Sequence, residues 1–144
     1  MGDLVLDLTR TIPAPRDIVF AAFRDTERVA QWWGPEGFAV PHVDFSTLVG
    51  EPYRIDMQSP DGERFYVHGV FRTVHPSERL SFTFEWEPPD ADDVETLVDL
   101  TFADRDGETE LSLWQGDFRT EARLELHRNG WSESFDKLER LLGH

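Results

Sequence analysis

The sequence contains no cysteine, so disulfide bonds and thiolate chemistry are excluded. It has no apolar run of 18 residues, and its first residues lack the basic and apolar segments of a secretory signal. Cations are scarce, because 14 basic residues face 29 acidic ones and the formal net charge is −15. Nucleic acids and anionic membranes need clustered cations, so we expect neither as a partner. A cytoplasmic location is the expectation that remains.

What the chain does contain is apolar material for one core. Its 144 residues match the usual size of a single domain, and 39% are hydrophobic, with five Trp and eleven Phe. Disordered acidic chains lack this aromatic content. The negative charge lies in residues 1–118, because residues 119–144 hold five acids and five bases. We therefore interpret the charge as a solvating coat of this acidic protein.

The N-terminal part predicts a strand and two short helices. Residues 3–12 alternate apolar and polar side chains, which is typical of a strand. Pro15 suits the first position of a helix that continues to about Asp25. Asp25 or Thr26 can cap a second helix that runs through Trp33, where a Gly-Pro pair ends it.

The middle of the chain predicts a meander of six strands separated by turn sequences rich in Gly, Pro and Asp. The expected ranges are 38–48, 51–58, 64–75, 79–87, 94–104 and 108–116. In the fourth of these strands one face holds Leu80, Phe82, Phe84 and Trp86, and the other holds Ser81, Thr83, Glu85 and Glu87. We expect an antiparallel sheet with one apolar face and one wet, acidic face.

Residues 120–142 change to a helical period. Their apolar stripe consists of Leu124, His127, Trp131, Phe135, Leu138 and Leu142. Gly130 interrupts this helix at a cost of about 1 kcal/mol relative to Ala, which suggests that another group approaches the backbone there. The apolar sheet face needs a cover, and this helix is long enough to provide it. We predict an α+β fold in which a curved sheet of about seven strands surrounds the C-terminal helix and the two short helices close one end.

Several segments together resemble a known family. They are residues 10–20, Trp32-Trp33-Gly34-Pro35 with Phe38, and residues 53–57, 59–62, 69–71, 76–82 and 127–131. In combination they are similar to the bacterial homologues of the C-terminal domain of the activator of heat-shock protein 90 ATPase. That family belongs to the START-like (SRPBCC) helix-grip superfamily, which also includes polyketide cyclases. The resemblance covers the chain from about residue 5 to its end, and implies one helix-grip domain over residues 1–144 with an internal cavity.

Two departures limit what the resemblance implies. Gly50-Glu51-Pro52 stands where members often have Gly-Gly. Trp114-Gln115-Gly116-Asp117 stands where members often have Thr-His-Glu-Gly. Any role of that family His or Glu therefore does not transfer to this chain.

The candidate ligand-binding residues are mainly aromatic. They are Trp33, Phe71, Phe82, Phe84, His127 and Trp131. The aromatic members could line a cavity, or they could simply fill the core, as aromatic residues commonly do. His127 could donate a hydrogen bond to a ligand or act as an acid or base. We favour a structural histidine with satisfied nitrogens, because the sequence places no carboxylate beside it.

No metal, cofactor or catalytic residue is predicted. The histidines His42, His68, His75, His127 and His144 are scattered without zinc-ligand spacing. The acids Asp90, Asp92, Asp93 and Glu95 lack the calcium-loop pattern and indicate a solvated loop. There is no nucleophile elbow, P-loop or dinucleotide fingerprint.

The main functional hypothesis is non-catalytic binding of a small hydrophobic or amphipathic molecule between the sheet and the C-terminal helix. Two alternatives stay open. One is a co-chaperone-like interaction module that stimulates the ATPase of heat-shock protein 90, and the other is a polyketide cyclase-like or lyase-like enzyme. Both alternatives rest on the resemblance alone. Some relatives form dimers, so a homodimer is a further expectation for which the sequence identifies no surface.

Overall fold

A computed structural model describes residues 4–45, 48–89, 91 and 93–143. The elements are β1 (Leu6–Ile12), α1 (Arg16–Arg24), α2 (Thr26–Trp32), β2 (Ala39–Phe45), β3 (Pro52–Gln58), β4 (Arg64–His75), β5 (Arg79–Glu87), β6 (Thr96–Arg105), β7 (Glu108–Gly116) and α3 (Glu121–Leu142). This confirms the predicted order of elements. Residues 3 and 46–47 of the predicted strands lie outside the described residues.

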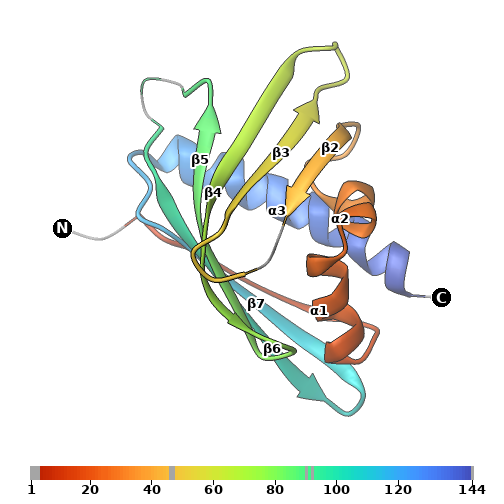
Figure 1. The fold of residues 1–144 in the computed structure, drawn as a ribbon. Coiled ribbons are helices and arrows are strands. Elements are labelled where there is room, and N and C mark those ends of the chain that lie inside the picture. The colour runs from red at the N-terminus through yellow and green to blue at the C-terminus, as the bar shows by residue number, and fades with distance from the viewer. Residues whose placement is uncertain (1–3, 46–47, 90, 92, 144) are drawn as a thin grey trace.

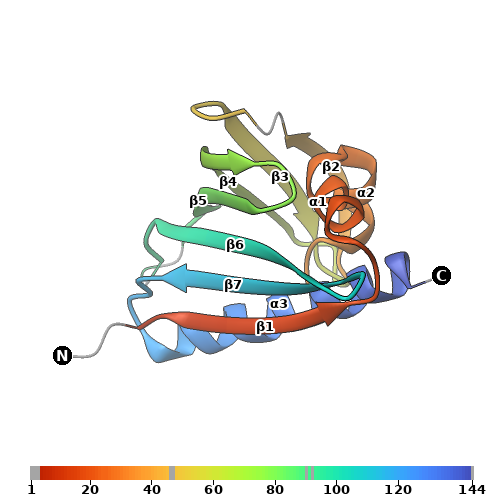
Figure 2. The same cartoon turned by 90° about the horizontal axis from the view of Figure 1, so that it is seen from below.

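The strands form one antiparallel sheet in the order β1-β7-β6-β5-β4-β3-β2. Neighbours from β2 to β7 follow each other in the chain, as the turn sequences predict, and β1 pairs alongside β7. The sheet curves around α3, which crosses its inner face (Figure 1). Seen from below, β1 runs across α3, β7 and β6 follow beside β1 in the sheet, and α1 and α2 stand together at one side (Figure 2). The structure therefore has the predicted α+β helix-grip architecture.

The two short helices are fixed by local hydrogen bonds. Asp25 ends α1 and caps α2, because its side chain accepts a hydrogen bond from the Glu27 N–H at 3.0 Å. The indole N–H of Trp32 donates to the carbonyl of Ala22 at 2.9 Å, which ties α2 to α1. Pro15 is the N-cap residue of α1 rather than its first helical residue, because its backbone is extended.

Helix α3 is held at its start and along its length. The Thr120 side chain caps it by accepting from the Arg123 N–H at 3.1 Å. Arg10 of β1 donates to Asp136 and Glu139, each at 2.7 Å, so the edge strand is joined to the C-terminal half of the helix. The buried residues of α3 are Leu124, His127, Trp131, Ser134, Phe135 and Leu138. This face follows the predicted apolar stripe.

Strand β4 curves along its length (Figure 1), and its pairing with β5 is irregular. The β4–β5 register shifts between Phe71 and Thr73. Just before this shift, a Cβ atom on Gly69 would lie only 1.9 Å from the carbonyl oxygen of Thr83. The Val70 N–H instead donates to the Thr83 hydroxyl at 2.8 Å. Glycine is therefore needed where the two backbones approach each other.

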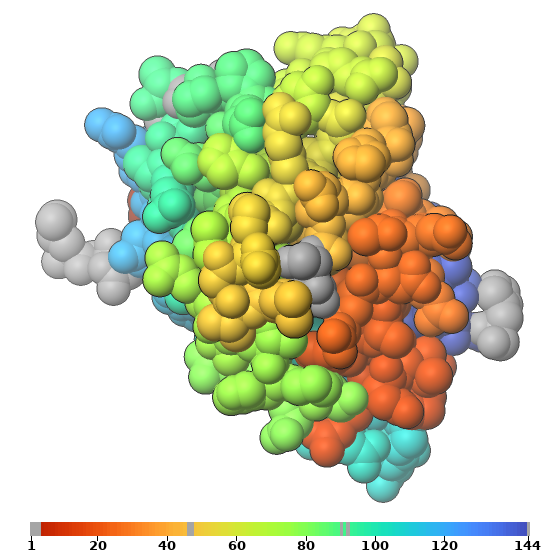
Figure 3. All heavy atoms as spheres, in the orientation of Figure 1, coloured from red at the N-terminus to blue at the C-terminus, as the bar shows by residue number. Residues whose placement is uncertain are grey.

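The outer face of the sheet is only partly wet. Ser81 and Thr83 point away from the core, as predicted, yet both are buried. The prediction of a wet face is wrong at these residues: Thr83 packs closely against Gly69 of β4, and Ser81 pairs with Thr73 of the same strand. Elsewhere the outer face carries ion pairs such as that between Arg79 and Asp99, at 2.7 Å. Seen from this side, the sheet, α1 and α2 hide most of α3 (Figure 3).

Among the described residues, no helix is long and apolar enough to cross a membrane. The longest helix, α3, has a polar outer side and an inner side that packs on the sheet.

Candidate ligand-binding cavity

A cavity of about 380 Å³ lies between one end of the sheet and the N-terminal half of α3. Its walls come from the segment after α2, the end of β3, the start of β4, the end of β5 and α3. The lining residues are Trp33, Gly34, Pro35, Phe38, Met57, Glu63, Phe65, Phe84, Trp86, Pro88, Asp93, Arg123, Leu126, His127, Gly130, Trp131 and Ser134. This volume falls within the range of small-molecule pockets.

Aromatic rings brace the inner wall of the cavity. Trp33 meets Trp131 edge to face, with ring centroids 5.2 Å apart, and stacks on Phe84 at 6.5 Å. Phe84 in turn meets Trp86 edge to face at 5.5 Å. Such contacts stabilise the rings beyond their burial alone. The wall is therefore apolar and held in place before any ligand enters.

Both ring nitrogens of His127 are occupied. Its Nε2 atom accepts a hydrogen bond from the indole N–H of Trp86 at 2.9 Å, and its Nδ1 atom lies 2.7 Å from the Arg123 carbonyl oxygen. These partners require a neutral ring with the proton on Nδ1. Burial lowers the pKa of His127, which also favours the neutral form. The geometry matches the satisfied histidine favoured from the sequence and leaves no ring nitrogen for a ligand.

A chain of buried polar groups fixes Trp131. Its indole N–H donates to the Gln115 side-chain oxygen at 2.8 Å, and the Gln115 amide donates to the Thr96 hydroxyl at 2.9 Å. Gln115 is fully buried. Sequence reasoning missed its role, although it alternates in phase with the apolar residues Leu111 and Leu113 of β7. A polar residue on an apolar strand face was the available signal.

Charged groups stand at the edges of the cavity. The Arg123 Nε atom lies 3.4 Å from an Asp93 carboxylate oxygen, in a pair that is largely buried. Lys137 donates to the carbonyls of Trp33 and Pro35 at 3.3 and 3.2 Å, so it holds the lining turn against α3. Burial lowers the pKa of Lys137. Glu63, in the turn before β4, is exposed at the rim.

The structure brings four of the six predicted ligand-binding residues into the cavity lining: Trp33, Phe84, His127 and Trp131. Phe71 and Phe82 lie elsewhere, fully buried in the core. The Phe71 ring packs on Phe45 with ring centroids 4.9 Å apart, and the Phe82 ring packs on Tyr53 with centroids 5.3 Å apart. The expectation that these two line the cavity is not met, because the cavity lies toward the other end of β5.

Several lining residues were not singled out from the sequence. They include Phe38, Met57, Phe65, Trp86 and Arg123. Trp86 continues the stripe of Phe82 and Phe84, and Arg123 lies one helical turn before His127. The alternation along β5 and the helical spacing along α3 place these residues on the faces that meet inside the molecule. Neither pattern shows at which end of the sheet the cavity opens.

Gly130 does not mark a close approach of another group. A Cβ atom there would have Pro35 Cγ as its nearest neighbour outside the helix turn, at 3.8 Å, which is an ordinary contact. The expectation from the sequence is therefore wrong at this position. Instead, Gly130 leaves open space, because it forms part of the cavity lining.

In the part of the chain that the structure describes, no three His, Cys, Asp or Glu residues are grouped so that they could hold a metal ion. His144, Asp90 and Asp92 lie outside the described residues. The side chain of Asp93, from the predicted solvated loop, is instead only 8% exposed and is paired with Arg123.

Comparison with known proteins decides the family. The profile of the activator of Hsp90 ATPase homolog 1-like proteins matches residues 13–143. The chain belongs to this family. Protein CV1439 from Chromobacterium violaceum is 26% identical, with a TM-score of 0.87 and 96% of each chain covered. An AHSA1 protein from Silicibacter pomeroyi is 30% identical, with a TM-score of 0.84, and the alignment covers 96% of this chain and 97% of that one. No curated protein matches the sequence.

Membership confirms the resemblance on which the helix-grip prediction rested. The matched solved structures share the sheet, the two short helices and the long C-terminal helix over nearly the whole chain. In this member of the activator of Hsp90 ATPase homolog 1-like family, the cavity lies between the sheet and α3.

Proposed function

We propose that this family member binds a small hydrophobic or amphipathic molecule in the cavity between the sheet and α3, without catalysing its conversion. The observation that carries the proposal is the cavity of about 380 Å³ with a preformed wall of Trp33, Phe84 and Trp131. An apolar ligand gains binding free energy when it covers such a wall and displaces weakly held water from it.

The arrangement of polar groups supports binding rather than catalysis. A general acid or base needs a ring nitrogen or carboxylate within hydrogen-bond reach of the reacting atom. The nitrogens of His127 are engaged by Trp86 and Arg123. Of the two lining carboxylates, Asp93 is paired with Arg123, and Glu63 is exposed at the rim. Co-chaperone activity and cyclase-like activity are implied by the family alone, and no contact in the described residues favours either of them.

The position of Gly130 allows a direct test. Gly130→Leu should fill part of the cavity with a side chain, whereas Gly130→Ala adds one methyl group within ordinary contact distance of Pro35. We expect 1-octanol to bind the native protein and the Ala variant in isothermal titration calorimetry, and to bind Gly130→Leu at least about tenfold more weakly. Equal binding to all three folded proteins, or binding to none, would contradict the proposal.

Native mass spectrometry gives an independent measurement. A small molecule that co-purifies with the native protein should be lost from Gly130→Leu and retained by Gly130→Ala. Retention of the same mass by the Leu variant would place its binding outside the cavity.

A further inference from the structure

The edge of the cavity carries more negative than positive charge. The charged lining residues are Glu63, Asp93 and Arg123. Arg123 is held by Asp93 at 3.4 Å, and His127 is neutral because both of its nitrogens are engaged. Among the described residues, the Glu63 carboxylate has no ion-pair partner. Glu63 is therefore the charge most available to the polar end of a ligand.

The aromatic wall favours the same sign of charge. The faces of Trp and Phe rings carry negative potential and attract cations within about 6 Å of the ring centroid. Three tryptophans, Trp33, Trp86 and Trp131, line the cavity. An anionic head group at the rim would instead lie near the Glu63 carboxylate, in the field of a chain with a net charge of −15.

We propose that the cavity selects amphipathic cations, with an apolar body and an ammonium-type head group, over amphipathic anions such as fatty acids. This inference rests on the proposed function and adds the chemical class of the ligand. The apolar body lies against the wall of Trp33, Phe84 and Trp131, and the head group lies toward the rim at Glu63. A carboxylate ligand would have to compete with Asp93 for Arg123, the charged group of the lining suited to bind it.

The test compares three probes with the same chain: octylammonium, 1-octanol and octanoate. At pH 7 and low ionic strength we expect a dissociation constant for octylammonium at least about tenfold lower than that for octanoate, with 1-octanol between them. Glu63→Gln should reduce the ratio of the octanoate dissociation constant to the octylammonium dissociation constant by about threefold or more. The substitution removes the negative charge at the rim but keeps the shape of the side chain.

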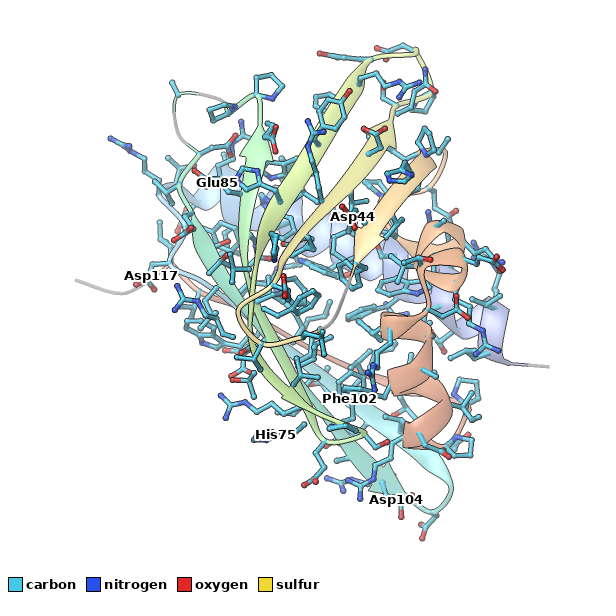
Figure 4. All side chains as sticks on the ribbon, in the orientation of Figure 1. Asp44, His75, Glu85, Phe102, Asp104 and Asp117 are labelled. Atoms are coloured by element: carbon cyan, nitrogen blue, oxygen red, sulfur yellow. The ribbon has the colours of Figure 1, made fainter. Side chains whose placement is uncertain are left out.

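Glu108→Gln is the matched control, because it removes one exposed acid at the far end of the sheet. Glu108 begins β7, next to the hairpin that follows Asp104 (Figure 4), whereas Glu63 lies in the β3–β4 turn at the opposite end. This variant has the same net charge as Glu63→Gln. If the preference for cations comes from the charge at the rim and not from the net charge of the protein, Glu108→Gln keeps the native ratio of the two dissociation constants.

The outcomes separate the two proposals. Octanoate binding as tightly as octylammonium, while 1-octanol also binds, would overturn the cation selection and leave the apolar cavity intact. An equal loss of selectivity in Glu63→Gln and Glu108→Gln would also overturn the role of the rim. Failure of all three probes to bind would overturn the proposed function itself.

Discussion

At the scale of single residues, His127 joins α3 to β5 through its hydrogen bond from Trp86. The ring is surrounded by Phe84 and Phe118, with centroids 5.6 and 4.8 Å away, so a charge on it would be poorly solvated. Protonation of Nε2 would also place an N–H group against the indole N–H of Trp86. The neutral ring is thus part of the folded structure.

This arrangement predicts a loss of stability in acid. The unfolded chain binds a proton at the ordinary histidine pKa of about 6.5, whereas burial lowers the pKa in the folded chain. As the pH falls below about 6.5, the unfolded state binds more protons, and the free energy of unfolding falls by up to about 1.4 kcal/mol per pH unit until the folded pKa is reached.

The measurement is urea unfolding of the native protein and His127→Gln between about pH 7.5 and about pH 5, a window from about one unit above to about 1.5 units below the ordinary histidine pKa. The difference in unfolding free energy between the two proteins should shrink toward acid pH. A constant difference would show that His127 does not carry this dependence.

Gly130 provides a prediction of the opposite sign. Its Cβ position is open and its backbone is helical, so Gly130→Ala should raise the free energy of unfolding by about 1 kcal/mol. Chemical denaturation checks this. A loss of stability would mean that the space beside Pro35 is tighter than the structure shows.

At the scale of elements, Gly69 allows β4 and β5 to approach each other closely beside the register shift in their pairing. A methyl group at Gly69 would collide with the Thr83 backbone, which cannot move without breaking the β4–β5 pairing. Gly69→Ala should therefore lower the free energy of unfolding by about 1–3 kcal/mol, as overpacked substitutions do. Gly130→Ala is its matched control, since the same chemical change is expected to stabilise there. Equal changes in the free energy of unfolding at Gly69 and Gly130 would contradict the close approach of β4 and β5 at Gly69.

The anchoring of α3 to β1 gives another prediction at this scale. Arg10 is partly buried, and its guanidinium group contacts Asp136 and Glu139. Because both acids are partly exposed, Arg10→Met should cost only about 1–2 kcal/mol of unfolding free energy. Adding Asp136→Asn and Glu139→Gln to Arg10→Met should lower the free energy of unfolding little further, because the contacts of both acids with Arg10 are already lost. Additive losses would mean that Arg10 acts through other contacts.

The periodicity of the chain predicted the elements well, because each strand and helix shows its buried face locally. The cavity could not be located in the same way. Phe82 and Phe84 have equivalent positions in the pattern of β5, yet one fills the core and the other lines the cavity. Which of them meets open space depends on the packing of Phe45 and Tyr53, residues that come from distant strands. The buried pairing of Gln115 with Trp131 likewise needs the folded chain.

At the scale of the whole molecule, the net charge of −15 opposes compaction. Surface ion pairs such as Arg79 with Asp99 offset only a small part of this repulsion. Raising the ionic strength from about 10 mM to about 150 mM shortens the Debye length to about 8 Å, so we expect the melting temperature to rise. Differential scanning calorimetry measures this change. A lower melting temperature in salt would indicate that ion pairs dominate over the net repulsion.

The central claim is that the cavity beside α3 binds an apolar ligand, and the indole N–H signals in a ¹H–¹⁵N NMR spectrum test it most directly. Trp33, Trp86 and Trp131 line the cavity, Trp32 is fully buried outside it, and Trp114 lies on the outer face of the sheet. On titration with 1-octanol, the account predicts that the three lining signals shift most and that the Trp114 signal stays in place. Shifts confined to Trp114, or no shift of the three lining signals at saturating octanol, would contradict it.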